Sequence, residues 1–162
     1  MKAVLALLLT ATLVWAAAPA AAGADDRSLR AAGRSRDATF EELGRKTRRA
    51  FRVWVNSGYA PRPARRVVRL LRAARGQLDL VVAAVMAEQP SSAFGERYKY
   101  LLLVSMEEFD RSLAWQARGV RARTRGRLVR ARRAFERSDA LFRRSARHQR
   151  QAVEAIRNVV PD

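Results

Sequence analysis

The sequence LVRARRAFERSDALFRRSARHQRQAVEAI, residues 128–156, decides the fold class because it is heavily charged and also regularly apolar. Its apolar and small residues recur at alternating spacings of three and four, the period of one face of an α-helix. The arginines fall mainly on the opposite face. The pattern predicts a bundle helix from about Gly126 to Val160, with a seam made of Leu128, Ala131, Phe135, Ser138, Phe142, Ser145, Gln149, Ala152, Ile156 and Val159.

Three segments upstream have the same helical period. The first begins at a capping box of Thr39 and Glu42 and ends at Gly58. The others run from about Ala64 to Glu88 and from just after Pro90 to about Ala117, and no segment alternates as a strand does. The second of the three has a regular seam of Val67, Leu71, Ala74, Leu78, Val81 and Val85. We therefore predict an all-α fold, an antiparallel helical bundle of about four helices whose last helix is the longest.

The chain divides into three parts. Residues 1–24 combine a lysine, an apolar run and an Ala-x-Ala site, which are the features of a signal peptide cleaved after Ala24. A membrane anchor is the alternative, but a span needs about 20 apolar residues and Pro19 interrupts this run. Residues 25–38 lack periodicity and predict a flexible arm, and residues 39–160 predict a single helical-bundle domain. We expect an exported protein, secreted or periplasmic.

Positive charge dominates the composition. The chain has 33 lysine and arginine residues against 15 aspartate and glutamate residues, a net charge of +18. Such a charge attracts lipid headgroups, envelope polymers or nucleic acid. Two clusters are the predicted anion-binding residues: Arg62, Arg65, Arg66, Arg69 and Arg72, and Arg130, Arg133, Arg137, Arg144 and Arg147. The alternative is that these arginines only solvate the surface and reflect a genome rich in G and C.

Reactive side chains are few. The chain has one histidine and no cysteine, so it offers no thiol nucleophile and no cysteine or multi-histidine metal site. His148 lies at the edge of the predicted seam, where a half-covered imidazole is expected, and the sequence indicates no second group to orient it. Haem held by His148 and a methionine, Met86 or Met106, is a less favoured alternative, because helical methionines usually fill core gaps. We predict no catalytic residue, metal or cofactor.

Other motifs add little chemistry. Glu107, Glu108 and Asp110 do not converge as a hydrolase pair would, so they are expected to be solvated or to pair with arginines of neighbouring helices. Glycine-rich phosphate loops are absent from the sequence. Trp54 and Trp115 are expected to pack inside the bundle rather than to stack on nucleobases. Nucleic acid is therefore a possible but less favoured partner.

The leading hypothesis is a non-enzymatic exported bundle that binds an anionic envelope component or a membrane surface. The alternative is a structural or chaperone-like helical oligomer that uses apolar helix faces. Exported all-helical stress chaperones are similar in size and charge, but their Leu-Thr-x-x-Gln signature is absent. The predicted last helix is about 50 Å long and the second about 38 Å. An overhanging tip at Ile156, Val159 and Val160 would favour a homo-oligomer.

Overall fold

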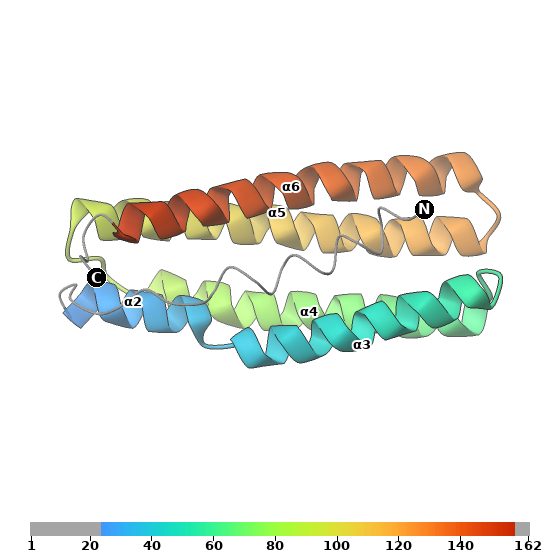
Figure 1. Ribbon diagram of the computed structural model, residues 1–162, viewed down its shortest axis with the longest axis horizontal. Coiled ribbons are helices and arrows are strands. Elements are labelled where there is room, and N and C mark those ends of the chain that lie inside the picture. Colours follow the sequence, from blue (N-terminus) through green and yellow to red (C-terminus); the bar gives the residue numbers. More distant parts are fainter. Residues whose placement is uncertain (1–23, 158–162) are drawn as a thin grey trace.

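The computed structural model describes residues 24–157, and the chain forms helices over almost all of that range (Figure 1). The predicted signal peptide, apart from Ala24, lies outside the described residues, as do Val159 and Val160. The helices are α2 (Ala24–Arg34), α3 (Asp37–Asn56), α4 (Pro61–Ala87), α5 (Ala93–Thr124) and α6 (Leu128–Arg157).

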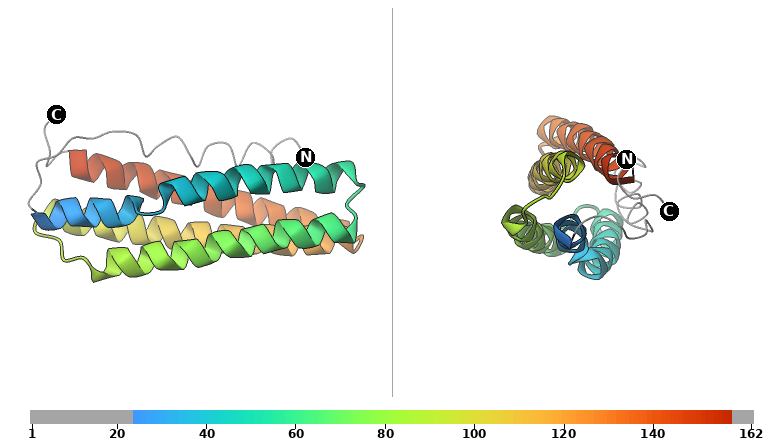
Figure 2. Two further views of the ribbon diagram at one scale, coloured as in Figure 1. Left: turned by 90° about the horizontal axis from the view of Figure 1, so that it is seen from below. Right: turned by 90° about the vertical axis from the view of Figure 1, so that its left-hand side faces the viewer.

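The helices form two antiparallel hairpins laid side by side. α3 and α4 make one hairpin, and α5 and α6 make the other. Figure 2 shows that α2 and α3 follow one another along α4, so that together they occupy one corner of a four-cornered bundle. The predicted all-α antiparallel bundle is confirmed. Its last helix is long, with 30 residues, although α5 is longer by two.

The core has two parts along the axis of the bundle. One part joins α3, α4 and α5, with Trp54, Leu71 and Leu113 all at most 2 % exposed. The other part joins α2, α4, α5 and α6. Burial raises the pKa of Tyr98 in this second part to about 12. All six predicted seam residues of α4 are buried, so its helical periodicity placed it correctly at the centre.

A line of small residues joins α5 to α6. Ser105 and Ser112 on α5 lie seven residues apart and face Ser145 and Ser138 on α6. The Oγ atoms are 3.1 Å apart in the Ser105–Ser145 pair and 3.0 Å apart in the Ser112–Ser138 pair. Each pair also makes a hydrogen bond from a hydroxyl to a backbone carbonyl of the other helix. The two backbones are therefore close together, which larger seam residues would prevent.

The third predicted helix ends too early, and a glycine explains the error. α5 continues past Ala117 to Thr124. Gly119 lies inside it, where a Cβ atom would come within 2.7 Å of the Phe135 ring. Glycine in a helix interior costs about 1 kcal/mol relative to alanine. Here it makes room for an aromatic ring of α6, so it belongs to the helix instead of ending it.

The capping box at Thr39 and Glu42 is not formed. α3 begins two residues earlier, at Asp37, and its N-cap Arg36 makes no side-chain cap. Glu42 instead pairs with Lys46, one turn further on, at 2.5 Å. The predicted end of this helix is correct, because Gly58 has a φ of 66°, which glycine adopts without strain.

The predicted flexible arm, residues 25–38, is wrong, because α2 fills most of this range. Leu29 is fully buried in the core against α4 and α5. Asp26 is 1 % exposed and accepts hydrogen bonds from the Ser91 backbone N–H at 3.0 Å and from the Ser92 hydroxyl at 2.7 Å. Ser92 in turn caps α5 by accepting from the Gly95 N–H. The hydrogen bonds of Asp26 therefore join residues that are 65 and 66 positions apart, which local periodicity does not reveal.

We expect replacement of Asp26 by alanine to release α2 from the bundle. It removes two hydrogen bonds to a buried carboxylate and leaves the Ser91 N–H without its acceptor, a loss of about 1–3 kcal/mol. Hydrogen exchange should show that the α2 amides exchange faster than in the wild type. The α6 amides should still exchange only through unfolding of the whole bundle. Asp79→Ala, at an exposed position, is the matched control. Unchanged protection of α2 in Asp26→Ala would show that this carboxylate does not dock it.

The predicted overhang of the last helix is not seen at Ile156. α5 and α6 have nearly equal lengths and run alongside each other, and Ile156 is 3 % exposed in the core. The mismatch predicted between the last and the second helix is also smaller, because α4 begins at Pro61, earlier than predicted, and α6 begins at Leu128, later than predicted. Ile156 therefore gives no support to a homo-oligomer, which stays a prediction.

Candidate anion-binding surface

The two short turns within the hairpins, residues 57–60 and 125–127, lie at the same end of the bundle. The α3–α4 turn and the α5–α6 turn meet there, as Figure 1 shows at the right. We call this the turn end, and define it as residues 43–78 and 111–135. It contains the last 14 of the 20 residues of α3, the first two thirds of α4, the end of α5 and the start of α6.

The turn end contains no acidic residue. Residues 43–78 and 111–135 include 20 arginines and lysines but no aspartate or glutamate. All 15 acidic residues of the chain lie outside these two ranges. The antiparallel topology brings the two acid-free runs to the same place, so the charge of the molecule is strongly asymmetric along its length.

Four of these basic side chains form ion pairs, each with an acid at the border of the turn end. Lys46 pairs with Glu42, Arg75 with Asp110, Arg111 with Glu107 and Arg132 with Glu136. Hydrogen bonds to these carboxylates raise the pKa of Arg75 and of Arg132, so both stay charged. The Arg75–Asp110 pair is bidentate, at 2.6 and 2.8 Å. It confirms the predicted pairing of Asp110 with a neighbouring helix.

An aromatic cluster holds the two turns together. The Trp54 indole, 2 % exposed, donates to the Thr124 hydroxyl at 3.2 Å and so joins the end of α3 to the end of α5. The Tyr59 ring packs edge-on against Trp54, and the guanidinium of Arg123 lies 4.0 Å above Tyr59. Trp54 therefore packs in the core, as predicted.

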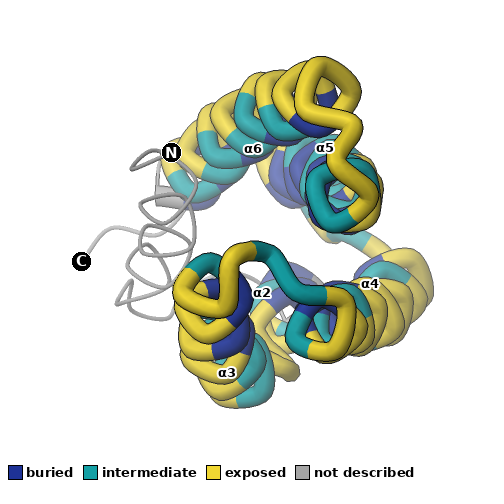
Figure 3. Tube along the Cα trace, turned by 90° about the vertical axis from the view of Figure 1, so that its right-hand side faces the viewer, coloured by how far each residue is buried: buried dark blue, intermediate teal, exposed yellow. Residues whose placement is uncertain are grey.

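Every predicted anion-binding arginine is exposed, but the ten do not make one site. The cluster of Arg62, Arg65, Arg66, Arg69 and Arg72 lies on α4, and the other five lie on α6. Figure 3 looks onto the turn end and shows α4 and α6 at different corners, each with its outer face exposed. The α4 cluster and Arg130 and Arg133 belong to the turn end, while Arg144 and Arg147 lie further along α6.

Two of the predicted residues already have partners within the chain. Arg137 lies over the Trp115 ring at 4.8 Å, and Arg118 lies over the same ring at 4.5 Å. Arg144 contacts Glu108 at 3.2 Å. Trp115 is half-buried under these guanidinium groups. The best candidates for contact with an external anion are therefore the exposed arginines of the turn end outside these ion pairs and ring contacts, such as Arg62, Arg66 and Arg130.

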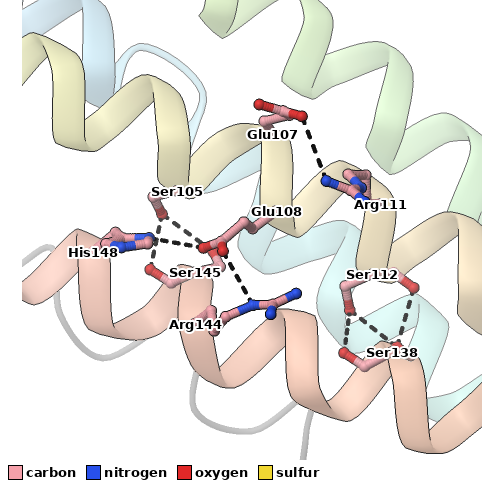
Figure 4. Close-up of polar contacts among 9 residues, drawn as sticks. All are labelled: Ser105, Glu107, Glu108, Arg111, Ser112, Ser138, Arg144, Ser145 and His148. Carbon is pink, nitrogen blue, oxygen red and sulfur yellow. Dashed lines mark hydrogen bonds and ion pairs between the residues drawn. The ribbon is translucent and has the colours of Figure 1, made fainter.

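Glu108 forms a small polar cluster with His148. Its Oε2 atom lies 2.8 Å from His148 Nδ1, and its Oε1 atom faces Arg144 (Figure 4). The expectation that nothing orients His148 is thus wrong, because α5 supplies a carboxylate that is 40 residues away in sequence. The nearby Ser105 and Ser145 hydroxyls bond to each other. The imidazole is 29 % exposed, which confirms its place at the edge of the seam.

The methionines considered for haem ligation lie elsewhere. Met106 is 6 % exposed and packs in the core part that includes α2, and Met86 is 57 % exposed on α4. Within residues 24–157, no three histidine, aspartate or glutamate side chains come together as a metal-binding group would require.

Sequence reasoning missed the arginines at the end of α5 and in the turn that follows it. The prediction placed those before Gly126 outside any helix, because it ended the third helix near Ala117. The sequence does contain a signal for them, because they lie in a run without acidic residues. An antiparallel bundle brings that run next to the start of α4. The missed arginines are Arg118, Arg121, Arg123, Arg125 and Arg127.

Comparison with protein-family models, with curated proteins and with solved structures finds no match to this chain. None of the helices within residues 24–157 has a stretch that is both long and apolar enough to cross a bilayer. The function must therefore be argued from the chain's own surface.

Proposed function

We propose that this protein is an exported, non-enzymatic helical bundle that binds an anionic partner through the arginines of its turn end. The observation that carries the proposal is the absence of acidic residues from the turn end, where 20 basic residues gather. Guanidinium groups bind phosphate and carboxylate groups by paired hydrogen bonds. The partner is expected to present many such groups, as lipid headgroups and envelope polymers do.

The position of two arginines supports a functional origin of this charge. Arg62 lies in the first turn of α4 and Arg130 in the first turn of α6, and neither turn contains an acidic residue. The amino end of a helix carries a partial positive charge, so a cation there costs about 0.3–1 kcal/mol. These arginines therefore weaken the free bundle, and a bound anion would offset the repulsion.

The proposal predicts a binding that depends strongly on salt. Affinity for heparin, a soluble polyanion, is expected to fall by about two orders of magnitude between about 50 and about 200 mM salt. The triple variant Arg62→Glu, Arg66→Glu, Arg130→Glu should lose a further factor of at least about 30 at low salt. Fluorescence anisotropy with labelled heparin measures both effects.

A second triple variant serves as the control, because it has the same net charge as the turn-end variant. Arg27→Glu, Arg97→Glu, Arg150→Glu changes three exposed arginines at the opposite end, and it should weaken heparin binding by no more than a few-fold. The turn-end variant should also unfold at a higher temperature than the wild type, because it places acids in two helix first turns. Equal losses in the two variants would refute a localised site. Binding that persists at high salt would favour the apolar alternative.

A further inference from the structure

The α5–α6 turn combines exposed apolar side chains with arginines. Leu128 is 56 % exposed and Val129 is 66 % exposed, although both begin α6 and Leu128 was predicted to lie in its seam. Arg125, Arg127 and Arg130 flank them, and the residues from Arg125 to Arg130 are all exposed. An open depression of about 440 Å³ is lined by Arg127, Leu128, Val129 and Arg130.

The place of Leu128 explains why it fails to join the core. The turn that precedes it closes through the Gly126 backbone, which has a φ of 71°, and through hydrogen bonds of Gly126 and Arg127 to α5 carbonyls. α6 therefore begins at the end of the bundle, directly after this turn. Ala131, one turn later, is the first residue of α6 to be buried.

A soluble polyanion offers no apolar region in which two exposed aliphatic side chains could be buried, but a lipid bilayer does. Peripheral proteins bind bilayers by placing apolar side chains at the boundary of headgroups and acyl chains while cationic groups contact anionic headgroups. Arginine suits this depth, because its apolar stem can lie along the acyl chains while the guanidinium stays among the phosphates. The α5–α6 turn presents both kinds of group within six residues, at an end of the molecule free of acids.

We infer that the turn end docks end-on onto anionic lipid bilayers, with Leu128 and Val129 inserted at the boundary of headgroups and acyl chains and with Arg125, Arg127 and Arg130 on lipid phosphates. This inference rests on the proposed function and names the lipid surface as the anionic partner. The bundle axis then stands away from the membrane, and the opposite, acid-containing end faces solution.

A pair of aliphatic substitutions separates lipid insertion from general anion binding. Leu128→Ser, Val129→Ser should bind vesicles of equal parts phosphatidylcholine and phosphatidylglycerol at least about 10-fold more weakly than the wild type. Its affinity for heparin should stay within about twofold of the wild type, because every arginine is kept. Leu80→Ser, Met86→Ser is the control, since these residues are 48 % and 57 % exposed on α4 outside the turn end. The control should bind vesicles like the wild type.

The absence of cysteine allows a direct probe of the tip. Val129→Cys, labelled with an environment-sensitive fluorophore, should shift to shorter emission wavelength with the anionic vesicles, and the same label at Met86→Cys should not. Neither label should respond to pure phosphatidylcholine vesicles at the same concentration. All variants keep residues 1–24, so any contribution of that apolar segment is equal in each comparison.

The outcomes distinguish this inference from the function on which it rests. Heparin binding without vesicle binding, or vesicle binding that leaves the Val129→Cys label unchanged, overturns lipid docking and leaves anion binding in place. Equal weakening on heparin and on vesicles by the serine pair also overturns it. Failure of the wild type to bind either heparin or anionic vesicles overturns both.

Discussion

Replacing Ser138 by leucine is expected to lower the free energy of unfolding by about 2–6 kcal/mol. Ser138 is fully buried between α5 and α6, and its hydroxyl lies 3.0 Å from that of Ser112. Added carbon atoms at such a site cost about 1–3 kcal/mol through overpacking. Loss of the Ser138 hydroxyl costs about 1–3 kcal/mol more, because the Ser112 hydroxyl loses one of its two partners and the Ser112 carbonyl loses its side-chain donor.

The alanine variants make the argument specific. Ser138→Ala alone should cost about 1 kcal/mol, because it leaves Ser112 partly unsatisfied. The double variant Ser112→Ala, Ser138→Ala removes both hydroxyls and keeps the close approach of the helices, so it should be nearly as stable as the wild type. Urea unfolding followed by far-UV circular dichroism gives all three values. A leucine variant within about 0.5 kcal/mol of the wild type would mean that the helices can separate there without penalty.

Helical periodicity predicted the fold correctly because, within a bundle, the buried face of each helix follows the spacing of its apolar residues. The seam of α4 is correct at every position, and in α6 it placed Ala131, Ser138, Ser145, Ala152 and Ile156 correctly in the interior. It failed for Leu128 because spacing does not tell where a bundle ends. It missed α2 because Leu29 and Asp26 are held by residues of α4 and α5 and of the turn between them, not by a local pattern.

The candidate site was predicted in part, for a related reason. Exposure of the arginines on α4 and α6 follows from the same periodicity, since residues opposite a buried seam face solvent. Periodicity does not tell which of them have partners, and Arg137 and Arg144 are engaged through residues of α5. The asymmetry of charge also needs topology, because two acid-free runs separated by more than 30 residues meet only when the chain folds back.

The charge asymmetry and the aromatic cluster belong to one physical problem. Many cations are held at one end of a small bundle, and they repel each other. Repulsion between these like charges opposes the approach of the two turns, so packing must hold them together. Trp54 is the residue best placed for this, because it contacts the α3–α4 turn through Tyr59 and the end of α5 through Thr124.

Trp54→Ala is accordingly expected to cost about 3–5 kcal/mol, the usual loss for an aromatic side chain removed from a core. Trp54→Phe keeps a ring against Phe51 and Tyr59 and loses the indole hydrogen bond, so it should cost about 1–1.5 kcal/mol. Thermal unfolding by circular dichroism ranks the two. A loss below about 1 kcal/mol in Trp54→Ala would show that the turns are held together by other contacts.

Heparin tests whether the cluster also serves binding. A ligand that binds only the folded state stabilises it according to its affinity for that state. If Trp54 only filled space, heparin would raise the unfolding temperatures of the wild type, of Trp54→Ala and of Ser138→Leu by similar amounts. If it holds the arginines of the two turns at a spacing that one polyanion can bridge, heparin will stabilise Trp54→Ala less than Ser138→Leu, whose turn end is intact. We expect the second result, because Tyr59 in the α3–α4 turn packs on Trp54, and Arg123 at the end of α5 lies over Tyr59.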